Sequence, residues 1–149
     1  MPLIRSTSLL RSNELFGALT DGELEKLSPL CNEFTVAQDG LLFNEGRVAS
    51  HLYIVMEGQI ALHKAIRAPQ ARLPRRTTVA ICRAGAVLGW SALVEPYKYS
   101  LSAVAWESSN LIRIDSKLFR KALEMYPGIG FKVMRSLSTV ISDRLRACE

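Results

Sequence analysis

Between residues 34 and 114 the chain is a succession of short apolar, β-rich runs, and this pattern limits the fold more than any other feature. The runs lie at 41–43, 52–56, 59–62, 77–81, 101–105 and 110–114. Glycines at positions 40, 46, 58, 85 and 89 punctuate them, as expected where a chain must turn. Because many short strands with glycine turns and no helical period are typical of a sandwich or a barrel, we expect one of these folds here.

One turn and one long connection can be placed within this region. Glu57-Gly58 separates two of the runs and predicts a tight hairpin, because glycine tolerates a positive φ. The segment 64–76 carries five basic residues and no acidic one. The whole chain has 19 Lys and Arg against 14 Asp and Glu, a net charge of +5, so this segment accounts for the entire excess. Its basic residues are Lys64, Arg67, Arg72, Arg75 and Arg76.

We expect the segment 64–76 to form the exposed tip of a long hairpin, since Pro69 and Pro74 interrupt strand pairing. Such a charge run is either a solvated loop or a patch for phosphates or an acidic partner, and both interpretations stay open. Binding of DNA is not expected, because the rest of the chain is neutral and has no basic recognition helix.

Helical patterns flank the β-rich region. In residues 12–33, leucine and phenylalanine recur at helical spacings, and Thr20 followed by Glu23 predicts a capping box. In residues 116–149, one helix is expected to start with Ser116 as its N-cap and to stop before a proline, and a second helix to follow. The second helix carries a seam of Phe131, Met134, Ile141 and Leu145, widened by Val133, Leu137 and Val140. We expect the seam to be partly buried, either on its own domain or on a second copy in a homodimer.

Composition excludes several classes of protein. A chain of 149 residues with 48% hydrophobic residues fits one domain with a real core. No apolar run approaches the roughly 18 residues of a membrane span, and no signal peptide is recognisable. The cysteines, Cys31, Cys82 and Cys148, are odd in number and widely spaced, so we expect a soluble cytoplasmic protein without disulfides and without a membrane partner. No nucleophile–histidine or metal-ligand spacing occurs, so we expect no enzyme, no catalytic residue and no metal site.

Three stretches carry a resemblance to a known family. They are Gly-Leu-Leu-Phe-Asn-Glu-Gly at 40–46, His-Leu-Tyr-Ile-Val-Met-Glu-Gly-Gln-Ile at 51–60 and Ala-Gly-Ala-Val-Leu-Gly at 84–89. Together with the order of the predicted elements, they resemble a cyclic nucleotide-binding domain of the catabolite activator and protein kinase regulatory subunit type. The resemblance implies a mainly β protein with flanking helices, in one domain over 1–149. It places N-terminal helices at 12–33, a jelly-roll-like β-roll at 34–115 and a C-terminal helix pair at 116–149.

The resemblance also implies a phosphate-binding cassette at 85–102. In this family backbone N–H groups and an arginine bind the cyclic phosphate, and a glutamate accepts from the ribose hydroxyl. Here Trp90 stands at the position of the glutamate and Tyr99 at that of the arginine, while Lys98 is one residue away. The ligand-binding residues that we predict are Gly89, Trp90, Ser91, Ala92, Lys98, Tyr99, Ser100 and Ser102.

Aligned without a gap, the chain therefore lacks both charged contacts to the cyclic nucleotide, the glutamate and the arginine. This predicts a stand-alone regulatory or sensor module with altered or lost cyclic AMP binding, acting through a nucleotide-like ligand, another small ligand or an unidentified protein partner. Two alternatives stay open: a cyclic AMP receptor that uses Lys98, and a ligand-free dimerisation module. No cofactor is expected beyond such a small ligand. A DNA-binding transcription regulator is less expected, because no winged helix follows the last predicted helix.

Overall fold

The computed structural model describes residues 10–11, 13–66 and 75–147 of the chain. Within these residues, two four-stranded antiparallel sheets have the strand orders β1-β8-β3-β6 and β2-β7-β4-β5. The strands are β1 (Cys31–Val36), β2 (Leu41–Phe43), β3 (His51–Glu57), β4 (Ile60–Ile66), β5 (Arg75–Cys82), β6 (Val87–Leu88), β7 (Ser102–Ala105) and β8 (Ser109–Asp115). The helices are α2 (Asp21–Leu27), α3 (Ser116–Met125) and α4 (Pro127–Ala147), with short 3-10 helices η1 (Ser28–Leu30) and η2 (Trp90–Leu93).

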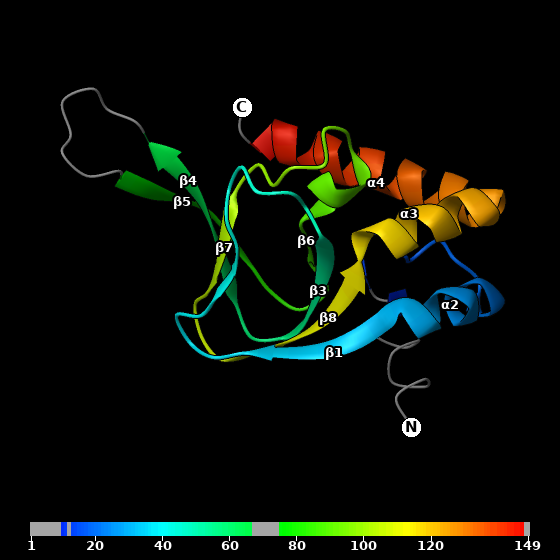
Figure 1. Ribbon diagram of the computed structural model, residues 1–149, viewed down its shortest axis with the longest axis horizontal. Helices are drawn as coiled ribbons and strands as arrows, with labels where there is room; N and C mark the ends of the chain where they lie inside the picture. The colour runs from blue at the N-terminus through cyan, green and yellow to red at the C-terminus, as the bar shows by residue number, and fades with distance from the viewer. Residues whose placement is uncertain (1–9, 12, 67–74, 148–149) are drawn as a thin grey trace.

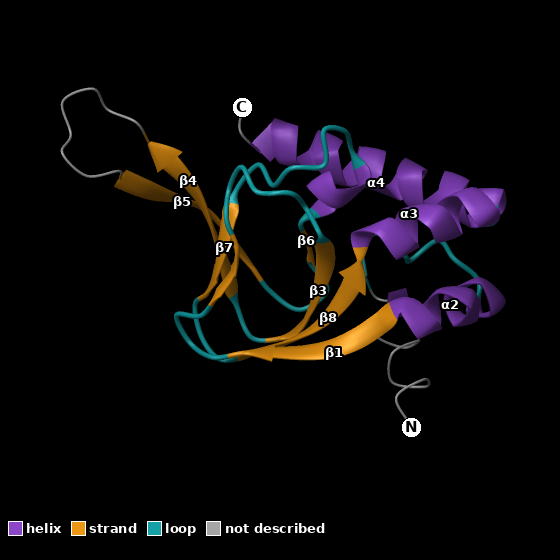
Figure 2. Cartoon of the chain, viewed as in Figure 1, coloured by secondary structure: helices purple, strands orange, loops and turns teal. Residues whose placement is uncertain are grey.

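The helices gather at one end of the sheets, and the β4–β5 hairpin projects at the other (Figure 1). Figure 2 shows the same division, with α4 reaching back along the sheets toward the hairpin. This mainly β, jelly-roll-like roll with flanking helices confirms the predicted fold class.

Strand β3 is buried on both faces and separates two hydrophobic cores. Leu52, Ile54 and Met56 belong to the core between the sheet and the helices. Tyr53 and Val55, which point the opposite way, belong to the core between the two sheets. Because successive side chains of a strand alternate between faces, a strand covered on both sides has an unbroken apolar sequence. This explains the run at 52–56.

The N-terminal boundary of the roll differs from the prediction. Strand β1 begins at Cys31, inside the segment 12–33 that was expected to be helical, so the helical prediction is wrong for its last residues. The 3-10 helix η1 follows α2 directly and contains Pro29. The helix does not continue through this residue, because a proline within a helix removes a hydrogen bond and clashes with the preceding turn. The chain then pairs with β8, with Cys31 opposite Ile114.

The local turn and cap signals are largely confirmed. The Glu23 amide donates to the Thr20 hydroxyl over 3.2 Å, and the Thr20 amide donates to the Glu23 carboxylate over 2.9 Å. Gly58 has a φ of 105°, as the predicted hairpin requires. The N-cap of α3 is Asp115, not Ser116, because the Asp115 carboxylate accepts the Leu118 amide at 2.9 Å.

The basic segment 64–76 lies at the β4–β5 hairpin, where Ile66 pairs with Arg75. Residues 67–74 are outside the described residues, so the predicted exposure of the tip itself stays a prediction. Lys64 is exposed and forms an ion pair with Glu45 at 3.0 Å. The first basic residue of the segment therefore has an acidic partner on the loop after β2.

Helix α4 docks on its own domain with a different set of residues from the seam. The buried face consists of Ile129, Val133, Leu137 and Val140, and the first three of these belong to the core next to β3. Of the seam, only Ile141 packs against that core. Phe131 and Leu145 keep 65% and 64% of their surface exposed, so the seam as a whole is not buried in this chain.

We expect Leu137→Ala to lower the free energy of unfolding by about 2–5 kcal/mol, because it leaves a cavity under α4. Phe131→Ala is the matched control on the same helix and should change it by about 0.5 kcal/mol or less. Urea denaturation of both variants measures the difference. Equal losses would contradict the assignment of the docking face.

Candidate functional site

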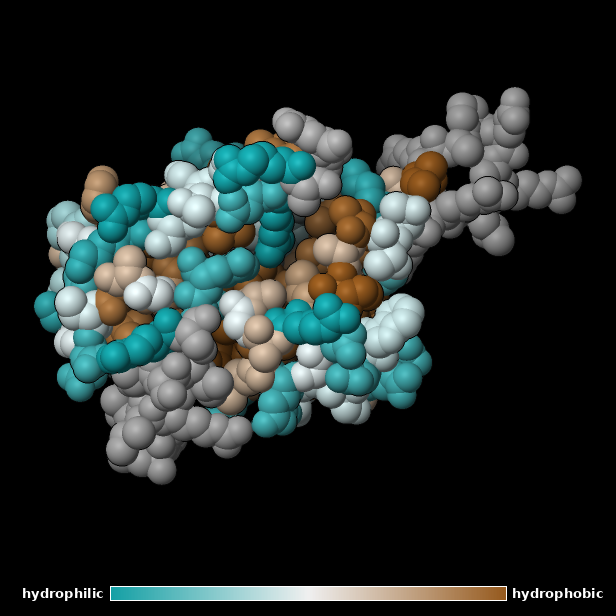
Figure 3. Space-filling model, turned by 180° about the vertical axis from the view of Figure 1, so that it is seen from behind, coloured by the Kyte–Doolittle hydropathy of each residue, from teal (hydrophilic) through white to brown (hydrophobic). Residues whose placement is uncertain are grey.

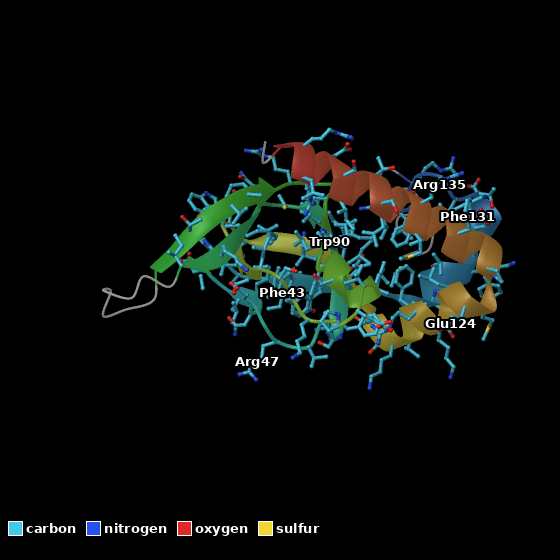
Figure 4. All side chains as sticks on the ribbon, turned by 90° about the horizontal axis from the view of Figure 1, so that it is seen from above. Phe43, Arg47, Trp90, Glu124, Phe131 and Arg135 are labelled. Carbon is cyan, nitrogen blue, oxygen red and sulfur yellow. The ribbon has the colours of Figure 1, made fainter. Side chains whose placement is uncertain are left out.

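A cavity of about 220 Å³ lies between η2, the start of β7 and the C-terminal end of α4. Its lining is mostly apolar, and Figure 3 shows hydrophobic residues reaching the surface in a band that runs toward the β4–β5 hairpin. In the view from above, Trp90 lies between Phe43 and the ribbon of α4 (Figure 4). The lining residues are Phe43, Leu62, Val79, Gly89, Trp90, Ser91, Tyr99, Ser100, Leu101, Ile141, Arg144 and Leu145.

The structure brings five of the predicted ligand-binding residues to this cavity, namely Gly89, Trp90, Ser91, Tyr99 and Ser100. It does not bring the other three. Ala92 is fully buried in the core between the sheets. Lys98 is exposed and pairs through its backbone with Val48. Ser102 is buried in β7, where its hydroxyl accepts the Glu45 amide at 2.9 Å.

The apolar walls of the cavity were not predicted from the sequence. Leu62 ends a run that was assigned to the roll, and Leu145 was placed in the seam of the last helix. No feature of the sequence around either residue indicates that the two line the same cavity. A signal existed only in the strand pattern, which predicts that inward-facing residues of different strands meet. The lining residues that were not predicted are Phe43, Leu62, Val79, Leu101, Ile141, Arg144 and Leu145.

Gly89 sets the entry of the chain into η2. Its φ is 75°, in the left-handed region that favours glycine. A Cβ at this position would lie 3.0 Å from the Tyr99 ring and 3.1 Å from the His51 carbonyl oxygen. The turn therefore brings the backbone close to β3, and η2, which follows it, lines the cavity with Trp90 and Ser91.

Helix α3 holds η2 in place through one arginine. The Arg120 guanidinium donates to the Ala92 carbonyl at 2.6 Å and lies over the Tyr97 ring at 4.0 Å. A hydrogen bond from a charged donor and a cation–π contact each stabilise the partner's position. Ser91 on η2 and Ser100 before β7 have their hydroxyl oxygens 3.1 Å apart, so these two groups hydrogen-bond each other at the cavity.

Tyr99 is held by its own neighbours. Its ring stacks on Phe43 with centroids 3.9 Å apart and an interplanar angle of 12°. Its hydroxyl donates to the His51 carbonyl at 2.6 Å and accepts the His51 amide at 3.1 Å. Only 5% of the residue is exposed, and burial raises the pKa of Tyr99 to about 12. The phenol is therefore neutral near pH 7, and its hydroxyl is engaged in fixing the start of β3.

Trp90 occupies the boundary between the cavity and the helical layer. It is half-buried and, like Ile141 of α4, packs against the core next to β3. An apolar ring at this position joins η2 to α4. It offers no acceptor for a sugar hydroxyl, since the indole carries only an N–H donor.

Arg144 lines the cavity from α4 and is already paired. Its guanidinium donates to the Glu14 carboxylate at 3.3 Å and to the Val87 carbonyl at 3.4 Å. Glu14 also accepts the Val87 amide at 3.1 Å. Arg144 is the only charged side chain that the described part of the chain contributes to the cavity lining, and its charge is balanced by Glu14.

Other reactive groups lie away from this cavity. Cys31 and Cys82 are free thiols, and burial raises the pKa of Cys31 to about 12, so it stays protonated; Cys148 lies outside the described residues. Burial and the nearby Arg113 lower the pKa of His51, so this imidazole is neutral near pH 7. Among the described residues, no three His, Cys, Asp or Glu side chains gather where they could hold a metal ion. None of the helices described is long and apolar enough to cross a membrane.

The family profile described as the cyclic nucleotide-binding domain matches residues 33–126, from β1 to the end of α3. The chain belongs to the cyclic nucleotide-binding domain family. The match includes η2 and all strands of the roll except the first two residues of β1, so nine of the twelve residues that line the cavity lie within it, and the other three belong to α4. No curated protein matches the chain.

Solved structures of this family have the same fold. A protein from Geobacter metallireducens described as cyclic nucleotide-binding is 26% identical, with a TM-score of 0.80 over 94% of this chain and 98% of that one. The N-terminal domain of a transcriptional regulator from Streptomyces coelicolor is 25% identical, with a TM-score of 0.74 over 95% of each chain. The regulatory domain of Toxoplasma gondii PKA, solved with cAMP, is 20% identical, with a TM-score of 0.71 over 80% of this chain and 44% of that one. Family and fold are thus those of regulatory proteins.

The hydroxyl of Tyr99 should stabilise this cyclic nucleotide-binding fold. Tyr99→Phe keeps the stack on Phe43 but leaves the His51 carbonyl and amide without that partner. We expect the free energy of unfolding to fall by about 1–3 kcal/mol near pH 7, measured by urea denaturation. Tyr126→Phe, at the half-exposed junction of α3 and α4, is the control and should change it little.

The same comparison has a predicted pH dependence. The pKa of Tyr99 is raised from 10.0 to about 12 in the folded chain, so the protonated phenol contributes stability that is fully present below pH 10. That contribution is lost as the pH rises through 12. The difference in stability between the unchanged protein and Tyr99→Phe should shrink over this interval, and a difference that widened there would contradict the assignment.

Proposed function

We propose that this chain is a regulatory or sensor domain whose ligand site has lost strong affinity for cyclic AMP. The observation that supports this most is the chemistry of Trp90 and Tyr99, which stand at the positions of the family's glutamate and arginine. Trp90 supplies an apolar ring and Tyr99 a neutral phenol that is bonded to His51. The cavity lining carries no unpaired charge within the described residues, since Arg144 is paired with Glu14.

The energetic argument rests on the phosphate. A cyclic phosphate that enters an apolar cavity loses its hydration, and this cost is offset only where a charged or strongly polar partner replaces water. A hydrogen bond to a charged group contributes about 1.5–3 kcal/mol. Two such contacts are absent here, one to the phosphate and one to the ribose. Taking a combined loss of roughly 3 kcal/mol, at about 1.4 kcal/mol per decade, affinity for cyclic AMP falls about 100-fold.

The alternative receptor, with Lys98 as the phosphate partner, has less support. Lys98 does not line the cavity, and its backbone pairs with Val48 in the loop before β3. Reaching the cavity would require residues next to Tyr99 to shift, although Tyr99 is held by a ring stack and two hydrogen bonds. We therefore favour a domain that acts through a different small ligand or through a protein partner, and we expect it to work in the cytoplasm and without catalysis.

A homodimer formed through α4 is a second candidate function. The exposed apolar residues Phe131 and Leu145 favour it, because α4 docks on its domain without using them. Sedimentation velocity of the unchanged protein and of Phe131→Asp tests this candidate. A monomer in both cases would contradict it.

Titration calorimetry with cyclic AMP tests the main proposal. We expect a dissociation constant at least about 100-fold weaker than that of a family member that has both charged residues. Lys98→Ala should leave the heat of binding unchanged, since this side chain lies outside the cavity. A micromolar or tighter constant would overturn the proposal, and its loss in Lys98→Ala would establish the alternative receptor.

A further inference from the structure

We propose that the cavity binds an uncharged, flat apolar molecule of about the size of two fused aromatic rings, held between Trp90 of η2 and the end of α4. This inference rests on the proposed function, because it names the class of ligand that such an altered site accepts. It is carried by the size of the cavity, by the chemistry of its walls and by the position of the last helix.

The walls supply flat and branched apolar surfaces. Trp90, the stacked rings of Phe43 and Tyr99, and Leu62 of β4 line the cavity, and so does Leu101 directly before β7. Apolar area that leaves water on binding stabilises the complex in proportion to its size. Aromatic side chains also favour offset or edge contacts with another ring. A planar apolar ligand gains from both effects, whereas an ionic group would also lose its hydration without a free charged partner among the described lining residues.

The size of the cavity limits the ligand. Apolar cavities of about 150 Å³ in proteins stay dry and bind benzene. The present cavity has about 220 Å³ and is open on one side, so it accommodates a bicyclic ring system but not a long chain in full. A single aromatic ring would leave part of the walls without contact.

The polar groups at the cavity favour a neutral ligand with at most one hydroxyl or similar group. Ser91 and Ser100 bond each other at 3.1 Å and can each turn to donate to or accept from one hydroxyl. The Tyr99 hydroxyl is engaged with the His51 backbone. Arg144 is the only cationic side chain in the described lining, and it is paired with Glu14. An anionic ligand would have to compete with Glu14 for this guanidinium.

The end of α4 provides the cover. Ile141 and Leu145 line the cavity, and Leu145 keeps 64% of its surface exposed. Val79, which also lines the cavity, keeps 48% of its surface exposed. Figure 3 shows hydrophobic residues at the surface over this face. A ligand in the cavity would cover these side chains, so binding removes apolar surface of the protein as well as that of the ligand.

Titration calorimetry with 2-naphthol near pH 7 tests the inference, with 2-naphthoate as the matched anionic probe. The two probes share a fused ring pair and differ in charge. We expect 2-naphthol to bind at least about tenfold more tightly than 2-naphthoate, and to raise the melting temperature. Equal affinities, tighter binding of 2-naphthoate, or no binding of 2-naphthol would overturn the inference.

Two variants locate the binding site. Leu145→Asp places a carboxylate at the opening on an exposed position, so the fold should persist, and we expect it to weaken 2-naphthol binding at least about tenfold. Leu118→Asp is the control, because Leu118 is 53% exposed on α3 and does not line the cavity. Equal effects of the two changes would overturn the assignment to this cavity. A circular dichroism spectrum and a melting curve of each variant confirm that it is folded.

The result with cyclic AMP separates this inference from the proposed function. Weak cyclic AMP binding together with absent 2-naphthol binding contradicts the ligand class alone. Tight cyclic AMP binding contradicts the proposed function, whatever the naphthol titration gives.

Discussion

The burial of β3 on both faces is the constraint on which the rest of the molecule depends. A strand whose side chains must all leave water needs a layer on each side. The second sheet covers one face through Tyr53 and Val55, and the helices cover the other through Leu52, Ile54 and Met56. The helix pair after β8 is therefore part of the core rather than an appendage. Because α4 belongs to that layer, its last turns come to lie over η2 and the cavity.

The cavity combines a turn at Gly89 with side chains that pair among themselves. Gly89 makes the turn, η2 follows it, and residues from several strands of the roll line the same cavity. The polar groups at this cavity form hydrogen bonds or ion pairs within the protein. Tyr99 bonds the backbone of β3, the two serines bond each other and Arg144 pairs with Glu14. Most of the surface that faces the cavity is apolar, so the proposed site selects by shape and by the absence of charge.

Local features of the fold followed from the sequence, and long-range ones did not. The capping box at Thr20 and the turn at Gly58 depend on neighbouring residues only, and both were predicted correctly. Strand β6 has two residues, Val87 and Leu88, and exists because it pairs with β3, so no periodic signal marks it. The start of β1 at Cys31 depends in the same way on pairing with β8.

The site was predictable in part for the same reason. The alignment of Trp90 and Tyr99 with the positions of the charged contacts required only a resemblance over 85–102. The partner of the Tyr99 hydroxyl is His51, which is 48 residues away, and no pattern in the sequence relates them. The sequence of α4 did not indicate which face docks, because its apolar residues are spread around more than half of the helix circumference. Which of them dock was decided by the shape of the core, and not by their spacing.

The carboxylate of Glu14 links the segment before the roll to the last turns of α4. It accepts the amide of β6 and the guanidinium of Arg144, which follows it by 130 residues. The segment before the roll and the last turns of the final helix therefore share one acceptor, placed against a strand that flanks β3. By the reciprocity of linked equilibria, fixing either of these segments favours the observed position of the other, up to the coupling free energy of this partly exposed contact.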